Sequence, residues 1–279
     1  MKVDLHLHTT ASDGSLTPAQ LIKRAADQDI RVIAITDHDS VEGIPEATLA
    51  AKNYKQLTVI PGVEISTDVP GNEIHVLGLF VDYANQQLQA ELTRLRVSRQ
   101  MRAENMTAKL NGLGLSIEYE RVLQLADGAS VGRPHIAKAL LEKGYISDFR
   151  EAFDKYIGRN GPAYAEREKM LPQEAVKLIA QTGGLPVLAH PADIENLEEL
   201  LPLYKKNGLI GIETYYHGYS MKTIDWLSQL ANNHGLITTG GSDYHNDNGD
   251  AGGPLGYTDI PSKSIEQLLL LARQKGHLK

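Results

Sequence analysis

The sequence predicts an α/β fold in which βα units form a parallel sheet or barrel, with a helical segment inserted near the middle of the chain. Three observations support this prediction. Seven short runs rich in Val, Ile and Leu have the length of strands, and helical patterns separate several of them. Between Tyr83 and Glu166 no strand pattern is found. Apolar strands that alternate with helices are typical of parallel sheets and barrels.

The expected strands and helices follow one another along the chain. The helix expected over residues 17–28 has Thr17 as its cap and Pro18 at its first position, and the helix over 172–184 ends at Gly183 and Gly184. Residues 197–208 and 221–235 show the same helical spacing. The strands are expected in the runs VDLHLH, RVIAITDHD, LTVIPGVE, IHVLGLF, LPVLAHP, LIGIETY and LITTGGSDYH.

The middle of the chain is expected to form a small helical domain. Residues 85–114 predict one long helix, and residues 116–127, 133–144 and 146–158 predict shorter ones. We therefore expect two domains. Residues 1–82 and 167–279 would form the βα scaffold, and residues 83–166 would form the insertion.

Composition excludes several classes of protein. The 279 residues carry a net charge of −7 without a long basic run, which argues against binding of duplex nucleic acid by bulk electrostatics but not against a site for one nucleotide. The chain has no cysteine, so any metal site must use nitrogen and oxygen ligands. We see no secretory signal and no apolar stretch of the roughly 18 to 20 residues that span a bilayer, and we expect a cytoplasmic protein.

Polar residues are concentrated where the expected strands end. His6 and His8 are two positions apart, so they share one face of the first strand. Asp243 and His245 share a face at the end of the last strand in the same way. The segments between them add, in chain order, Asp13, Asp37, His38, Asp39, Glu64 and His190.

His75 lies at the start of its run rather than at the end. The segment before it contains Pro70, Gly71 and Asn72, which predict a hairpin turn. If the strands on either side of this turn are antiparallel, the start of the second strand lies beside the end of the first. His75 would then lie near Glu64.

These side chains are expected to converge, because sites in barrels and open α/β sheets form at the carboxyl ends of the strands. A single histidine is more often a surface or hydrogen-bonded core residue. That explanation would have to account for six of the ten histidines together. One ion takes about four to six ligands, so nine nitrogen and oxygen ligands suit two or three ions with a bridging carboxylate.

The motifs DLHLHTTASDG, AITDHDSVEG, PGVEIS, HVLGL, AHP and GSDYH occur in this order, and with them the sequence resembles the polymerase and histidinol phosphatase (PHP) superfamily of metal-dependent phosphoesterases. The resemblance implies a distorted (β/α)7 barrel with a trinuclear metal site. It places His6, His8, Glu64 and Asp243 on one metal, and Glu64 as a bridge to a second metal with His75 and His190. Asp13, His38 and His245 would hold the third.

Two to three divalent ions are thus the expected cofactors. Mn²⁺ is the first expectation, and Fe²⁺, Zn²⁺ and Mg²⁺ are the alternatives, because mixed imidazole and carboxylate ligands suit such ions. The expected reaction is in-line attack on a phosphate ester by a metal-bridging hydroxide, with a metal-bound water or a site histidine protonating the leaving oxygen. The residues expected to act through the metals are His6, His8, Asp13, His38, Glu64, His190, Asp243 and His245.

The helical insertion and its VGRPHIA motif limit the resemblance to one branch of the superfamily. They resemble the branch that removes the 3′-phosphate from nucleoside 3′,5′-bisphosphates and whose members can also trim short RNA from its 5′ end. The resemblance implies a small phosphorylated nucleotide as substrate, with short RNA as a second class. No membrane partner and no stable binding of duplex nucleic acid are expected.

A second phosphate of the substrate would need cations. Arg96, Arg99 and Arg102 are spaced by three on the expected long helix, where the alternative is a solvated helix face. Arg133 and His135 precede a helix, and a helix start beside an arginine is a natural anion site.

Four acidic and histidine side chains near the expected metals have further expected roles. Asp13 and His38 are expected to contact the substrate as well as a metal. Asp37 and Asp39 would either orient histidines or cap loops.

Three other functions stay open at this point. Within the superfamily, the chain could hydrolyse nucleoside 5′-monophosphates or histidinol phosphate. The arginines of the insertion weigh against histidinol phosphate, whose amine is a cation. A metal-binding structural module without activity is the third alternative, and the full set of expected ligands weighs against it.

Overall fold

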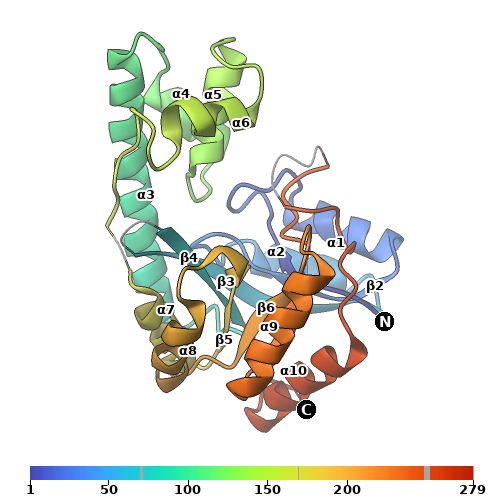
Figure 1. The fold of residues 1–279 in the computed structure, drawn as a ribbon. Coiled ribbons are helices and arrows are strands. Elements are labelled where there is room, and N and C mark those ends of the chain that lie inside the picture. The colour runs from blue at the N-terminus through green and yellow to red at the C-terminus, as the bar shows by residue number, and fades with distance from the viewer. Residues whose placement is uncertain (70–71, 169, 248–251, 279) are drawn as a thin grey trace.

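A seven-stranded sheet forms a nearly closed barrel in the computed structural model, which describes residues 1–69, 72–168, 170–247 and 252–278 (Figure 1). The strands pair in chain order, and each of the seven apolar runs contributes one of them. The prediction of a distorted (β/α)7 barrel is therefore confirmed. The strands are β1 (Lys2–Leu7), β2 (Ile30–Ile35), β3 (Thr58–Val69), β4 (Asn72–Leu79), β5 (Leu185–Leu188), β6 (Gly211–Tyr216) and β7 (Ile237–Gly241).

The barrel is distorted because β4 runs against both of its neighbours. The pairs β3–β4 and β4–β5 are antiparallel, whereas β1–β2, β2–β3, β5–β6 and β6–β7 are parallel. Closure between the first and last strands comes from a bridge of Leu7 with Tyr244. Gly241 allows the close approach there, since a Cβ at this position would lie 2.4 Å from the Cβ of His6.

The expected hairpin between Glu64 and His75 is present, but its strands are longer than expected. Val69 pairs with Asn72, and the predicted turn residues Pro70 and Gly71 lie outside the described residues. The expectation that the third strand ends at Glu64 is wrong. The strand continues through ISTDV to Val69. Its alternate residues Ile65, Thr67 and Val69 are β-branched, and such residues pack well in a pleated sheet.

The last strand is shorter than expected. It was expected to reach His245, but β7 ends at Gly241. Asp243 has a φ of 54°, in the left-handed region, which a regular strand does not contain. Asp243 and His245 flank Tyr244, so both still lie at the mouth of the barrel.

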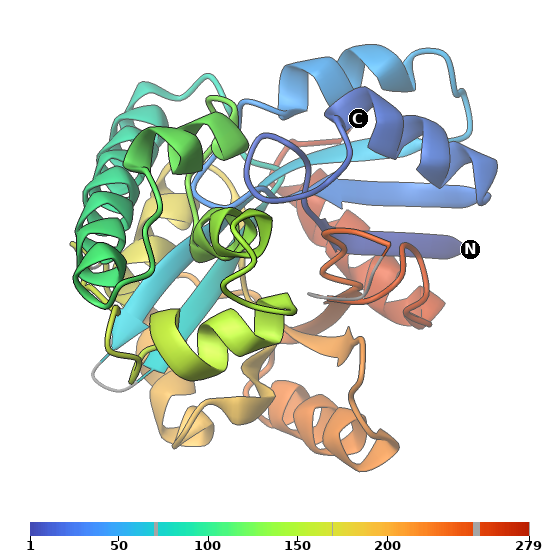
Figure 2. The same ribbon diagram turned by 90° about the horizontal axis from the view of Figure 1, so that it is seen from above.

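Helices cover the outside of the barrel (Figures 1 and 2). Thr17 caps the first helix by accepting a hydrogen bond from the backbone of Gln20, as the sequence predicts. Two helices, at Ile44–Ala51 and Ser262–Gln274, were not expected. The helices of the barrel are α1 (Pro18–Asp27), α2 (Ile44–Ala51), α7 (Pro172–Gln181), α8 (Leu197–Lys206), α9 (Met221–Asn233) and α10 (Ser262–Gln274), and a 3-10 turn spans Pro191–Asp193.

The middle of the chain is helical, and it contains no strand among its described residues. Its helices are α3 (Gln86–Gly112), α4 (Tyr119–Ala126), α5 (Arg133–Glu142) and α6 (Phe149–Ala152), which continues into a π-helical turn at Phe153–Ile157. Long helix α3 joins two cores. Leu92 and Leu95 pack in the core of the barrel, whereas Met106 and Leu110 pack in a separate core of the insertion.

The insertion lies over the mouth of the barrel. Helix α3 rises along one side and carries α4, α5 and α6 above the sheet (Figures 1 and 2). The backbone of Ser130 donates to the carbonyl of Ala11, and Arg159 lies 2.5 Å from Asp68 on β3. These contacts fix the insertion beside the strand ends that carry the expected site. Among the described residues, no helix combines the length and apolar character that a membrane span requires.

Candidate metal centre

The nine side chains that the sequence predicts as metal ligands lie together at the mouth of the barrel. They come from β1, the loop after it, the β3–β4 hairpin, and the segments after β2, β5 and β7. They are His6, His8, Asp13, His38, Glu64, His75, His190, Asp243 and His245.

One group contains His6, His8, Glu64 and Asp243. The Nε2 atoms of His6 and His8 each lie 3.3 Å from Oε2 of Glu64, and 3.2 and 3.0 Å from Oδ1 of Asp243. All four facing atoms are buried, and none has a hydrogen-bond partner within the described residues. Ions with ligand bonds of about 2.1 Å separate neighbouring ligand atoms by roughly 3 to 3.5 Å, so the residues fit a divalent cation.

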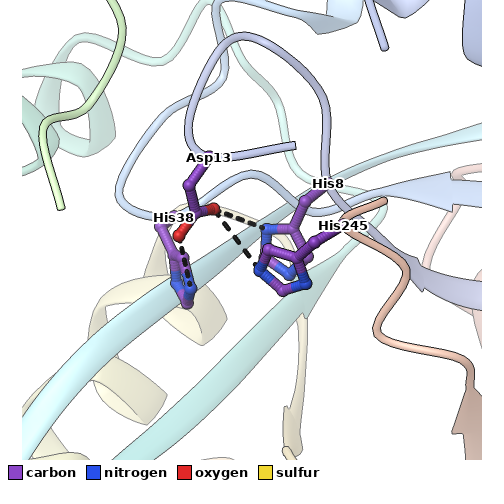
Figure 3. Close-up of side chains that lie close together, drawn as sticks. All are labelled: His8, Asp13, His38 and His245. Atoms are coloured by element: carbon purple, nitrogen blue, oxygen red, sulfur yellow. Dashed lines mark ion pairs between the residues drawn. The ribbon is translucent and has the colours of Figure 1, made fainter. Parts of the chain in front are cut away.

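Asp13 lies at the centre of a second group (Figure 3). Its Oδ1 lies 3.4 Å from Nε2 of His245 and 3.8 Å from Nδ1 of His8, and its Oδ2 lies 3.9 Å from Nε2 of His38. Oδ1 of Asp13 is buried without a hydrogen bond in the described parts of the chain. This group could also hold a cation.

Glu64 joins the groups. Its Oε1 lies 2.9 Å from Nδ1 of His75 and 3.2 Å from Nε2 of His190. Its Oε2 faces His6 and His8, and lies 2.9 Å from Nδ1 of His38. The two oxygens therefore face different sets of imidazoles, which is the arrangement that a bridging carboxylate needs.

The charges of this cluster compensate one another. Burial disfavours a charged His6, but the nearby Asp243, Glu213 and Glu64 outweigh burial and raise the pKa of His6 well above its usual value. The same competition raises the pKa of His8 to about 10. Burial disfavours a charged Glu64 as well, yet the surrounding imidazoles lower its pKa. Divalent cations would supply this positive charge while leaving the imidazoles as neutral ligands.

Asp37 caps a loop and reaches a histidine indirectly. Its carboxylate accepts hydrogen bonds from the backbone of Thr9 and from the hydroxyl of Ser12, both at 2.7 Å. The Ser12 hydroxyl in turn lies 3.5 Å from Nδ1 of His8. The loop-capping role is thus direct, and the effect on His8 passes through Ser12.

Asp39, like Asp37, binds a backbone N–H and reaches an expected ligand through a serine hydroxyl. It accepts hydrogen bonds from the backbone of Ser66 and from Nε of Arg99, at 3.0 and 2.6 Å. The Ser66 hydroxyl lies 3.2 Å from Nδ1 of His38. Asp39 therefore fixes the hairpin and an arginine of the insertion, and it reaches His38 through Ser66.

A cavity of about 170 Å³ adjoins the cluster, and arginines line it. Arg99 and Arg102, both expected at the substrate, are only 5% exposed. Nη2 of Arg133 lies 2.5 Å from Oε2 of Glu73, and Nη1 of Arg102 lies 3.6 Å from Oε1 of the same carboxylate. The lining residues are Asp13, His38, Ser66, Glu73, His75, Arg99, Arg102, Arg133, Pro134, Phe153, Arg167 and His245.

Two of the residues considered for the substrate lie elsewhere. Arg96 binds the carbonyl of Asp39 and the carboxylate of Glu42 at the rim, and is not among the side chains that line the cavity in the described structure. Nδ1 of His135 accepts a hydrogen bond from the backbone of Gly132, so this buried histidine caps helix α5.

Sequence reasoning missed several residues of the site, among them Ser66, Glu73 and Tyr216, and two of the missed residues show why. Glu213, on β6, is fully buried against His6. An acidic residue inside the apolar run LIGIETY was a signal for it. Arg167 is 8% exposed and lies in the cavity wall, where its Nη2 donates to the carbonyl of Ser66. No local pattern indicated Arg167, because its place depends on how the chain returns from the insertion.

The chain is similar over most of its length to proteins of known name. It is 33% identical over 265 residues to the 3′,5′-nucleoside bisphosphate phosphatase of Chromobacterium violaceum, with 93% of this chain and 92% of the relative covered. It is 35% identical over 248 residues to a 5′-3′ exoribonuclease of Haemophilus influenzae, with 88% and 90% covered. A solved structure from Bifidobacterium adolescentis, assigned as a metal-dependent phosphoesterase, has a TM-score of 0.87 at 28% identity, with 96% and 95% covered.

The PHP domain family matches residues 4–162, more than half of the chain. The two relatives are named for hydrolysis of phosphate esters, and the protein is an enzyme of this class. The cluster of imidazoles and carboxylates agrees with that assignment. This chain belongs to the PHP family of metal-dependent phosphoesterases.

Proposed function

We propose that the protein removes the 3′-phosphate from nucleoside 3′,5′-bisphosphates. The observation that carries the proposal is the buried excess of positive charge beside the metal centre. Arg99, Arg102, Arg133 and Arg167 line the cavity, whereas the acidic groups that pair with them are Asp39 and Glu73. A substrate with a second phosphate would balance this charge.

Arg102 and Arg167 are the least well paired of these arginines in the described structure. Burial is the main cause that lowers the pKa of Arg102 to about 9, and the neighbouring Arg99, Arg133 and Arg167 lower it further. Nη1 of Arg167 is buried and makes no hydrogen bond within the described residues. A phosphate in the cavity would supply oxygens for these donors.

Arg133 is the proposed anchor of the second phosphate. Its guanidinium lies 5.4 Å from the centre of the Phe153 ring, which supports it from the insertion. It is half-buried at the start of helix α5, where backbone amides also favour anions. A phosphate bound there would lie beside His38, His75 and His245, which line the same cavity.

The metal ligands are proposed to be the nine clustered side chains, holding two or three divalent ions, with Mn²⁺ as the first candidate. When bound, such ions activate the attacking water and neutralise charge on the phosphoryl group. The side chains that line the cavity would orient the phosphate ester for in-line attack by this water. Arg133 and Arg102 would bind one phosphate, and the open side of the ligand cluster would receive the other.

The names of the relatives support a nucleotide substrate. One relative is named for a nucleoside bisphosphate, and another for removal of nucleotides from the 5′ end of RNA. Short RNA is therefore the second candidate substrate.

The test is phosphate or nucleotide release from a panel of substrates with Mn²⁺, Mg²⁺ or Zn²⁺. The panel contains a nucleoside 3′,5′-bisphosphate, a 5′-monophosphate, histidinol phosphate and a short 5′-phosphorylated RNA. We expect the bisphosphate to have the highest kcat/KM. A higher kcat/KM for histidinol phosphate would contradict the proposal.

Substitution of the anchor gives a second test. Arg133→Ala should raise the KM for the bisphosphate about 10-fold or more, because a charge-assisted contact of about 1.5 to 3 kcal/mol is lost. Arg121→Ala is the matched control, since Arg121 lies on the surface of the insertion and pairs with Glu142. Unchanged KM and kcat in Arg133→Ala would show that this anchor is wrong.

A further inference from the structure

Strand β6 faces the metal centre but provides none of its nine expected ligands. The other strands, or the loops that follow them, provide at least one each. Even so, β6 carries buried polar side chains toward the cluster. Glu213 is fully buried, and the hydroxyl of Tyr216 contacts Asp243.

A bulge in β6 brings these two side chains to the same face. Glu213 pairs with Thr239 of β7, but Tyr215 pairs with Gly240 and Tyr216 with Gly241. One extra residue on β6, Thr214, therefore lies between the Glu213–Thr239 pair and the Tyr215–Gly240 pair. In a regular strand, residues three apart point to opposite faces, and the extra residue resets this alternation. Glu213 and Tyr216 thus both point into the barrel.

Glu213 holds two of the expected ligands at once. Its Oε1 lies 3.1 Å from Nδ1 of His6, and its Oε2 accepts a hydrogen bond of 2.8 Å from the backbone N–H of His190. Since a carboxylate only accepts, Nδ1 of His6 must carry a proton. When an ion is bound, the neutral imidazole would then offer its Nε2 lone pair to the ion, on the side where Glu64 and Asp243 also lie.

The contact with His190 also fixes its backbone. His190 has a φ of 29°, which residues with a Cβ rarely adopt. The hydrogen bond from its N–H to Glu213 helps to hold this conformation, and the conformation directs the imidazole toward Glu64.

Tyr216 selects one oxygen of Asp243. Its hydroxyl donates to Oδ2 at 2.8 Å, so Oδ1 is the oxygen that faces His6 and His8. Asp243 also has a positive φ, at 54°. Both expected ligands with positive φ values are thus held by β6, one through its backbone and one through its carboxylate.

We propose that β6 is the positioning strand of the metal centre. Glu213 sets the tautomer of His6 and the backbone of His190, and Tyr216 fixes Asp243 as a ligand through one oxygen. This inference rests on the proposed metal centre and on no particular substrate. Partners of this kind typically change metal affinity about 10- to 100-fold when they are removed.

The experiment compares Tyr216→Phe with Tyr215→Phe. The first removes only the hydroxyl that contacts Asp243. The second removes a hydroxyl from the neighbouring residue, which is partly buried and packs against an apolar cluster. Binding of Mn²⁺ to chelator-treated protein is measured from the electron paramagnetic resonance signal of free Mn²⁺. Melting temperatures without metal check that both variants fold.

We expect Tyr216→Phe to bind at least one Mn²⁺ about 10-fold more weakly, while Tyr215→Phe binds as the wild type does. Glu213→Gln should weaken binding further, because its amide would face either the His6 ring or the His190 N–H with a donor. Equal affinities in Tyr216→Phe and wild type would overturn the inference, as would an equal loss in Tyr215→Phe. Wild-type protein that takes up no Mn²⁺, Zn²⁺ or Fe²⁺ would instead overturn the metal centre itself.

Discussion

At the scale of single residues, the centre consists of buried atoms that face one another without hydrogen bonds. Nε2 of His6 and His8 and one oxygen each of Asp13, Glu64 and Asp243 are in this state among the described residues. Buried polar groups are otherwise nearly always paired. A cation is the partner that all five atoms have in common, because each of them can donate a lone pair.

His6→Ala tests this interpretation. Loss of a ligand that faces the carboxylates of Glu64 and Asp243 should remove at least one bound ion per chain and lower phosphatase activity about 100-fold or more. Metal content is measured by mass spectrometry and activity by phosphate release. His234→Ala is the control, because this half-buried histidine ends helix α9, away from the cluster. Full metal content in His6→Ala would refute the assignment.

Glu73 offers a second test among single residues. Its carboxylate pairs with Arg133 and Arg102, and although burial opposes ionisation, these cations lower the pKa of Glu73 to about 2. An incoming phosphate must therefore compete with a negative charge. Glu73→Gln should lower the KM for a 3′,5′-bisphosphate about fivefold, as expected for repulsion of about 1 kcal/mol.

The comparison substrate for Glu73→Gln is a nucleoside 3′-monophosphate, which lacks the second phosphate. Its KM should stay unchanged. A higher KM for the bisphosphate would mean that Glu73 orients the arginines instead of competing with the substrate.

At the scale of elements, the strands were predictable and their ends were not. Seven apolar runs gave seven strands, and the period of two correctly placed His6 and His8 on one face. The extension of β3 depends on pairing with β4, and the end of β7 depends on the backbone of Asp243. Such boundaries are set by tertiary contacts that local patterns do not contain.

Helix α3 connects the two cores, so its buried leucines should matter for the stability of the whole chain. Leu92→Ala should lower the free energy of unfolding by about 2 to 5 kcal/mol, because a fully buried side chain is replaced by a cavity. Leu113→Ala, at the exposed end of the same helix, should change it by less than about 0.5 kcal/mol. Urea unfolding measures both. Similar values for the two variants would mean that α3 does not contribute to the barrel core.

At the scale of the whole molecule, the site is assembled from both parts of the chain. The barrel provides the expected metal ligands, and the insertion provides Arg99, Arg102 and Arg133. Most of the ligands could be predicted because they lie at or just after the carboxyl ends of the expected strands, whereas Glu64 and His75 lie inside the long hairpin strands β3 and β4. Arg167 could not, since its position depends on the path by which residues 158–168 return along α3. Glu213 was missed because only strand-end residues were sought.

Metal binding should therefore stabilise the whole fold. Ions that bind the native chain and not the unfolded one add about 2.7 kcal/mol at 100 times Kd. Addition of Mn²⁺ to chelator-treated protein should raise Tm by several degrees, and His6→Ala should show a smaller shift. An identical shift in His6→Ala and wild type would place the stabilising ion elsewhere.

The proposed function requires two or three bound metal ions for hydrolysis of the 3′-phosphate of a nucleoside 3′,5′-bisphosphate. The most direct test is phosphate release by chelator-treated protein as Mn²⁺ is added in known equivalents. We predict no turnover without metal and a rise that reaches its maximum at two to three equivalents per chain, with the nucleoside 5′-monophosphate as product. Full turnover by the metal-free protein, or a maximum at one equivalent, would contradict the proposed metal centre.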